Sequence, residues 1–117
     1  MRIVVFFVAL VLSTPAAAQD WADRQGDVAL SMQEISDLTS GTVLTYYDDG
    51  QSSYGADGAY TYTYASGEMA SGSFTVEEDG KVCVIFTNGR DRCDRFVSSR
   101  GKIILLTAQG HRFPVRP

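Results

Sequence analysis

One stretch decides the fold: Lys81-Val82-Cys83-Val84-Ile85-Phe86-Thr87-Asn88-Gly89-Arg90-Asp91-Arg92-Cys93-Asp94-Arg95-Phe96. In this stretch two apolar-leaning runs flank an Asn-Gly pair, which is the strongest short-range signal for a β-hairpin. The chain has two cysteines, and each arm of this hairpin carries one of them. The position of the cysteines therefore bears on the length of the turn.

The two possible turns differ in which residues they place opposite each other. A two-residue loop would pair Cys83 with Asp94 and point Cys93 to the other face. A three-residue loop that ends at Gly89 in the left-handed conformation sets Cys83 opposite Cys93. The β-carbons of opposed residues lie about 4.5–5.5 Å apart, which is near disulfide range. We predict the three-residue loop and a Cys83–Cys93 disulfide.

Residues 1–18 have the features of a secretory signal peptide. Arg2 precedes the uncharged stretch Ile3 to Leu12, and Ala16-Ala17-Ala18 forms a cleavage site of small residues. Ten residues rise only about 15 Å as a helix, about half of a bilayer core, so a membrane span is not expected. We expect cleavage after Ala18 and a periplasmic or secreted mature chain.

Export favours a disulfide over free thiols, because disulfides persist in oxidising compartments. A metal or redox pair is the rival interpretation. The chain has no C-x-x-C motif and one histidine, His111, and its Asp-Gly turns lack the spacing of a calcium loop. We therefore expect no metal and no cofactor.

The charges are divided between the two halves of the chain. Residues 19–80 carry one basic and twelve acidic side chains, whereas residues 81–117 carry eight basic and two acidic ones. In a meander these halves become neighbours, so their charges can satisfy one another; an electropositive binding face is the alternative. The positive half lacks a pattern of stacked aromatic and basic residues, so a nucleic-acid partner is not expected.

In the mature chain we expect an arm followed by one β domain. Residues 19–30 are polar and acidic and predict a flexible arm, with Trp21 as its one large apolar anchor. Ser31 and Glu34 form a capping box that starts a short helix, and Gly41 can end it. Residues 31–117 are expected to form a single domain.

Everything after residue 41 is typical of β structure. Glycine-containing turns recur every 8 to 13 residues, which is the spacing of a strand plus a tight turn. The expected strands are approximately 42–48, 51–55, 59–65, 69–76, 81–87, 90–97, 102–107 and 111–115. No helix intervenes, so we predict a mainly all-β fold: an antiparallel up-and-down meander or small half-open barrel of about 7–8 short strands with one short N-terminal helix. The strand at 102–107 is apolar on both faces, and we expect the helix to cover one of them.

Two groups of residues are candidates for a binding surface. Tyr60, Tyr62 and Tyr64 share one face of a strand, and tyrosine suits contacts with sugars, peptides or proteins. A half-buried β surface also favours tyrosine, so this face is either core or binding surface, and we favour burial. The second group is Arg90, Arg92 and Arg95, which alternate with aspartates and are typical of a hairpin with cross-strand ion pairs.

Over most of residues 30–115 the chain resembles a group of small exported bacterial proteins of unknown function. The shared features are a signal peptide, a short helix that ends at a glycine, a tyrosine-rich strand with an Asp-Gly turn, and Asp-Gly-x-x-Cys at 79–83 with a second cysteine ten residues on. The resemblance implies an antiparallel β fold with one disulfide and implies no catalytic residues.

No nucleophile–base pair or other catalytic constellation is present, so we expect no enzyme activity. The expected function is a monomeric, non-enzymatic binding module that contacts an envelope component or protein. The alternative is a protein inhibitor of an envelope hydrolase. Some lysozyme inhibitors are small exported barrels with a Ser-Gly-x-x-Tyr loop, and here Ser66-Gly67-Glu68-Met69-Ala70 has alanine in place of the tyrosine.

Overall fold

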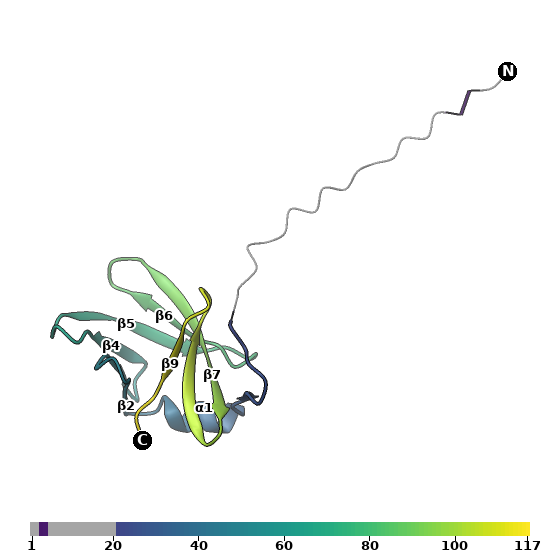
Figure 1. The fold of residues 1–117 in the computed structure, drawn as a ribbon. Coiled ribbons are helices and arrows are strands. Elements are labelled where there is room, and N and C mark those ends of the chain that lie inside the picture. Colours follow the sequence, from purple (N-terminus) through teal and green to yellow (C-terminus); the bar gives the residue numbers. More distant parts are fainter. Residues whose placement is uncertain (1–2, 5–20) are drawn as a thin grey trace.

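The chain folds into an antiparallel sheet that curls into a half-open barrel of eight strands (Figure 1). The computed structural model describes residues 3–4 and 21–117. Strands β2 to β9 are neighbours in chain order, and β1 pairs with β7. The elements are β1 (Val28–Ala29), α1 (Met32–Leu38), β2 (Thr42–Thr45), β3 (Gln51–Tyr54), β4 (Ala59–Thr63), β5 (Met69–Val76), β6 (Val82–Phe86), β7 (Asp91–Ser99), β8 (Lys102–Thr107) and β9 (Arg112–Pro114).

This arrangement confirms the predicted fold class. The predicted signal peptide falls, apart from Ile3 and Val4, outside the described residues and stays a prediction. Among the residues described, no helix is long and apolar enough to span a bilayer.

Six hairpin loops share one design, in which three residues connect two paired ones and the third residue is left-handed. The loops are closed by the pairs Tyr46–Gly50, Gly55–Ala59, Tyr64–Glu68, Glu77–Lys81, Phe86–Arg90 and Thr107–His111. The left-handed residue is a glycine in five of them and Asp49, with φ 69°, in the first. In five loops the middle Asp, Asn or Ser side chain accepts a hydrogen bond from the backbone N–H two residues on. Local turn chemistry thus fixes the register of most strand pairs.

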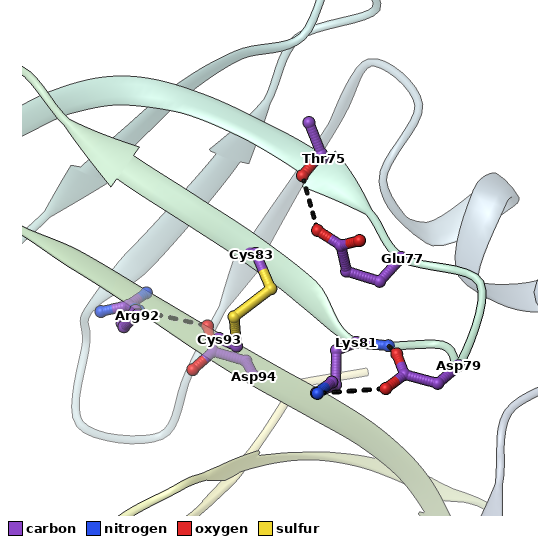
Figure 2. Close-up of a disulfide and its surroundings, with 8 residues drawn as sticks. All are labelled: Thr75, Glu77, Asp79, Lys81, Cys83, Arg92, Cys93 and Asp94. Carbon is purple, nitrogen blue, oxygen red and sulfur yellow. Dashed lines mark hydrogen bonds and ion pairs between the residues drawn. A yellow bond between two sulfur atoms is a disulfide. The ribbon is translucent and has the colours of Figure 1, made fainter.

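The hairpin of β6 and β7 has the predicted register. Gly89 has φ 86°, and Cys83 lies directly opposite Cys93. The two residues form a disulfide with a Cα–Cα distance of 4.0 Å. Figure 2 shows this bond between the two strands, with the Lys81–Asp79 ion pair nearby. Because Val82 and Val84 are fully buried in the barrel, Cys83 between them faces the outside.

The barrel interior is aromatic as well as aliphatic. Tyr54 and Tyr60 are each 1% exposed, and their ring centroids lie 5.2 Å apart. Phe74 packs edge-on against Tyr54, with 5.1 Å between centroids. The buried members of this core are Ile35, Leu44, Tyr46, Tyr54, Tyr60, Val82, Val84, Phe96 and Leu105.

Helix α1 lies across one end of the barrel (Figure 1). The predicted capping box is present: Glu34 N–H donates to Ser31 Oγ at 3.1 Å, and Ser31 N–H donates to Glu34 Oε1 at 3.0 Å. Ile35 is 2% exposed and belongs to the barrel core, and Leu30 and Leu38 pack beside it. With seven residues the helix is too short to be stable alone, so this burial holds it in place.

The segment before the helix is placed against the outer face of the barrel. The sequence predicts a flexible arm for residues 19–30; its described part, 21–30, includes β1, which pairs with β7. Trp21 packs on a second, outer cluster of Val97, Ile104 and Leu106. The strand at 102–107 is therefore covered on both faces, as expected, but the outer cover is this arm and not the helix.

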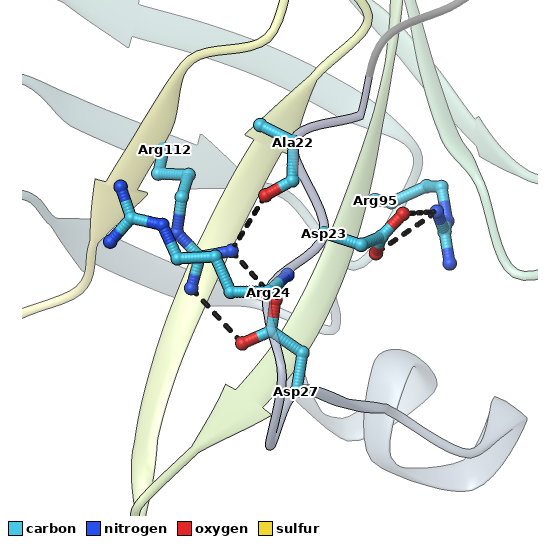
Figure 3. A network of polar contacts seen from close by, with 6 residues as sticks. All are labelled: Ala22, Asp23, Arg24, Asp27, Arg95 and Arg112. Carbon is cyan, nitrogen blue, oxygen red and sulfur yellow. Dashed lines mark hydrogen bonds and ion pairs between the residues drawn. The ribbon is translucent and has the colours of Figure 1, made fainter.

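Ion pairs fix the arm to the sheet (Figure 3). Arg112 donates to both oxygens of Asp27, at 2.6 and 3.0 Å, and to the carbonyl of Ala22 at 3.0 Å. On β7, which β8 separates from β9, Arg95 donates to Asp23 at 3.2 Å. These contacts confirm that charges of the acidic and basic halves satisfy one another.

The two ends of the eight-stranded sheet meet at one place. Tyr46, just after β2, forms an isolated antiparallel bridge with Val115, just after β9. Arg116 N–H also donates to the carbonyl of Thr45 at 2.8 Å. In the described residues, backbone pairing thus joins the two ends at this short stretch, and Arg116 adds an ion pair to Asp49.

Candidate functional site

The end of the barrel away from α1 holds a cavity of about 140 Å³. We call this cavity the barrel mouth, and its lining residues are Tyr62, Tyr64, Arg92, Leu105, Thr107 and Phe113. They lie where β4 and β8 finish and where β7 and β9 begin. Helix α1 instead borders the loop between β3 and β4 and the end of β5. The mouth is therefore the end that α1 leaves open.

The position of Arg92 follows from the register of the cysteine hairpin. Arg92 lies opposite Val84, and Asp94 lies opposite Val82, so both charged residues face the barrel core. The Arg92 side chain is 32% exposed and that of Asp94 is 1% exposed. Arg92 Nε donates to Asp94 Oδ2 at 3.1 Å. A charge pair thus lies inside a barrel that is otherwise mostly aromatic and aliphatic.

Three aromatic rings surround the Arg92 guanidinium. Its central carbon lies 5.4 Å from the ring centroid of Tyr62, 5.6 Å from that of Phe86 and 5.8 Å from that of Tyr60. Arg92 Nη2 also donates to the Tyr60 hydroxyl at 2.7 Å. Cation–π contacts of this kind strengthen when water is excluded, so these rings hold the guanidinium in one position.

The polar network continues deeper into the barrel. The Tyr60 hydroxyl lies 3.0 Å from Ser52 Oγ, which in turn lies 2.9 Å from the Tyr46 hydroxyl. Ser52 is fully buried. Two further buried atoms, the Tyr54 hydroxyl and Asp94 Oδ1, have no hydrogen-bond partner among the described residues. The network therefore runs from the mouth to the centre of the core.

Burial controls the protonation of these groups. It raises the pKa of the Asp94 carboxyl, although Arg92 acts in the opposite direction. It also raises the pKa of Tyr60, so the phenol stays neutral and can donate to Ser52. For Arg92, burial favours the neutral form, but attraction to Asp94 and the phenols outweighs it and raises the pKa. Arg92 is thus a permanent cation in the mouth.

The structure brings together only part of the predicted binding surface. Tyr60 lies in the core, Tyr62 is half-buried in the mouth, and Tyr64 is 51% exposed at its rim. The favoured burial of the tyrosine face is thus confirmed for Tyr60 and decreases toward the rim. Arg92 joins these residues.

The other two predicted arginines lie apart from the mouth. Arg90 is exposed in the turn before β7. Arg95 lies on the outer face, over the ring of Trp21 at 5.5 Å and paired with Asp23. The interpretation of all three arginines as members of cross-strand ion pairs within the hairpin is wrong, because Arg92 pairs along its own strand and Arg95 pairs with the arm.

Sequence reasoning missed Asp94, Leu105, Thr107 and Phe113 as neighbours of this site. The signal for Asp94 was available: a register with Cys83 opposite Cys93 places both neighbours of Cys93 on the face of Val82 and Val84. No comparable local signal points to Leu105, Thr107 or Phe113, which reach the mouth only because the sheet curls. Within the described ranges, no group of three or more His, Cys, Asp and Glu residues is close enough to hold a metal ion.

Comparisons of the chain with models of protein families, with curated proteins and with solved structures find no match. The function is therefore inferred from the geometry of the barrel mouth.

Proposed function

We propose that this protein is an exported, non-enzymatic binding module that holds its ligand in the barrel mouth. The observation that carries the proposal is Arg92, a cation held by aromatic rings at the border of a cavity that opens at one end of the barrel. Partial burial of a charge costs desolvation free energy, so such a charge is expected only where a partner offsets this cost or a function requires the charge. Small-ligand sites are typically concave, mostly apolar and equipped with a few fixed polar groups, as this mouth is.

The disulfide and the N-terminal sequence support the exported part of the proposal. A disulfide is typical of oxidising compartments, and the N-terminal sequence predicts secretion. We expect the mature protein to begin at Gln19 and to work in the periplasm or outside the cell.

A fragment screen by ¹H–¹⁵N NMR tests the site. We expect the amide shifts of the hits to cluster at Tyr62, Thr107 and Phe113. Tyr64→Ala should weaken most hits several-fold. Tyr47→Ala is the matched control, because Tyr47 is also 51% exposed but lies outside the mouth. Hits that cluster elsewhere, or that respond equally to both variants, would contradict the proposal.

An inhibitor of an envelope hydrolase is the second candidate, and the loop between β4 and β5 favours it. This loop projects from the same end of the barrel, and Tyr64 and Met69 beside it are 51% and 67% exposed. An exposed loop flanked by two large apolar side chains has a shape that suits an enzyme cleft. A lysozyme activity assay with increasing protein distinguishes the candidates, because a small-ligand module should leave the rate unchanged.

A further inference from the structure

We propose that the ligand of the barrel mouth is a small carboxylate with a single apolar ring. This inference rests on the proposed function and specifies its chemistry. The carboxylate would bind the Arg92 guanidinium, and the ring would lie among the apolar lining residues Tyr62, Tyr64, Leu105 and Phe113.

The guanidinium has capacity left for an anion. A guanidinium carries five N–H donors in a planar fork. Nε donates to Asp94 and Nη2 donates to Tyr60, and the Arg92 guanidinium has no other acceptor among the described residues. Arginine suits carboxylates because its fork can donate two parallel hydrogen bonds.

The guanidinium is also preorganised. Asp94 holds one side of it from a buried position, and the rings of Tyr60, Tyr62 and Phe86 surround it. Little side-chain freedom is therefore lost when an anion binds. Asp94 does not line the cavity, and Arg92 is the one charged residue that does among those the structure describes, so an incoming anion meets a cation first.

The size and lining of the cavity argue against a bare inorganic anion. Its volume of about 140 Å³ is close to that of an engineered apolar cavity of roughly 150 Å³ that binds benzene. Four of its six lining residues present rings or an aliphatic side chain. An anion without an apolar body would leave this surface uncovered, whereas an apolar ring alone would leave the guanidinium donors unused.

Three probes separate the two parts of the proposed ligand. Benzoate has both parts, benzyl alcohol has the ring without the charge, and inorganic phosphate has charge without the ring. In NMR titrations at constant ionic strength, we expect benzoate to bind at least tenfold more tightly than either of the others, with shifts at Tyr62, Thr107 and Phe113.

Matched variants assign the two parts to residues. Arg92→Lys keeps the charge but loses the fork, and it should weaken the affinity for benzoate about tenfold and the affinity for benzyl alcohol far less. Tyr64→Ala should lower the affinities for benzoate and for benzyl alcohol by the same factor. Arg90→Gln is the control, because Arg90 is an exposed arginine of the same hairpin, and it should change neither. Circular dichroism and thermal unfolding verify that each variant is folded.

The outcomes distinguish this inference from the proposed function. Equal affinity for benzoate and benzyl alcohol at the mouth would overturn the carboxylate assignment and leave the mouth as a binding site. Equal affinity for benzoate and phosphate would overturn the need for a ring. Benzoate shifts outside the mouth, or no benzoate binding up to its solubility, would overturn the inference, while the fragment screen would still decide the proposed function.

Discussion

At the scale of single residues, Gly72 shows how closely two strands approach. The pairing of β5 with both neighbours runs through Gly72 without a change of register. A β-carbon at this position would collide with the carbonyl oxygen of Ile85 and the Cα of Phe86. Both are backbone atoms, so the collision cannot be relieved by rotation of a side chain. Glycine is therefore required here for space rather than for backbone conformation.

We predict that Gly72→Ala lowers the free energy of unfolding by about 1–3 kcal/mol, as overpacking in a well-packed core does. Ser73→Ala is the control on the next, exposed position of the same strand, where a change within about 0.5 kcal/mol is expected. Chemical denaturation of both variants measures the difference. Equal stability of the two would show that the strands can separate slightly at no cost.

The residue scale also shows what the sequence could and could not predict. The two cysteines and Gly89 were sufficient to predict the loop, the register and the disulfide. The same register implied that Arg92 faces inward, but alternation of arginine with aspartate resembles a solvent-exposed strand, and this local pattern favoured the surface interpretation. Charged residues are rarely placed inside a small barrel. Only the cross-strand register of the hairpin, which sets the face on which each residue lies, could have overridden that pattern.

At the scale of elements, the strands were predictable because each turn carries its own signal. An Asp, Asn or Ser followed by a glycine occurs at most loops, and it both ends one strand and sets the pairing of the next. The N-terminal arm carries no such signal. β1 has two residues, and its place depends on Trp21 and Asp27 meeting partners on β7, β8 and β9, about 70 to 85 residues away. The local sequence of the arm shows only an acidic segment.

Acid should release this arm before the barrel unfolds. The hydrogen bonds from Arg112, together with that from the Arg24 backbone, lower the pKa of Asp27 from 3.8 to about 2. A lowered pKa in the folded state means that Asp27 contributes its full stabilisation above pH 3.8 and loses it as the pH falls toward 2. Trp21 is the only tryptophan, so its fluorescence reports the arm. We expect its emission to shift to the red in this pH range while far-UV circular dichroism changes little.

Two variants test whether Asp27 causes this acid transition. Asp27→Asn should show red-shifted Trp21 emission already at neutral pH, and its emission should no longer change between pH 4 and 2. Asp23→Asn removes the more exposed ion pair with Arg95, and surface pairs of this kind contribute about 0–1 kcal/mol, so its emission should follow the unaltered protein. The same acid transition in Asp27→Asn would attribute it to another group.

The disulfide between β6 and β7 leads to a second prediction at the scale of elements. Replacing both Cys83 and Cys93 by serine should lower the free energy of unfolding by about 2–3 kcal/mol, because a closed loop of this length restricts the unfolded chain. The register should survive, since the turn at Gly89 fixes it independently. Thermal unfolding of the double variant, compared with the disulfide-bonded parent protein, measures the loss. Free thiols in protein purified from an oxidising compartment would contradict the bond itself.

At the scale of the whole molecule, the curl of the sheet creates the mouth. Residues at the end of β4 line one cavity with residues of β7, β8 and β9, although β5 and β6 would separate β4 from these three strands in a flat sheet of the same order. The sequence predicts antiparallel strands that pair in chain order. It leaves an open meander and a half-open barrel as alternatives, because no single residue determines how far a sheet curls. The degree of closure depends on the seam between the two ends of the sheet, where Val115 and Arg116 meet Tyr46 and Thr45.

Removing the seam should therefore open the barrel without unfolding its centre. Deletion of residues 115–117 removes the bridge to Tyr46, the hydrogen bond to Thr45 and the apolar side chain of Val115, which packs on the core. We predict a loss of about 2 kcal/mol or more in the free energy of unfolding. Hydrogen exchange should accelerate in β2 and β9 and stay slow in β5 to β7, since their mutual pairing and the disulfide remain. Deletion of the exposed Pro117 alone is the control and should change neither quantity. Unchanged protection of β2 in the longer deletion would show that the eight strands keep their curl without the seam, and that the mouth is shaped by the twist of the sheet alone.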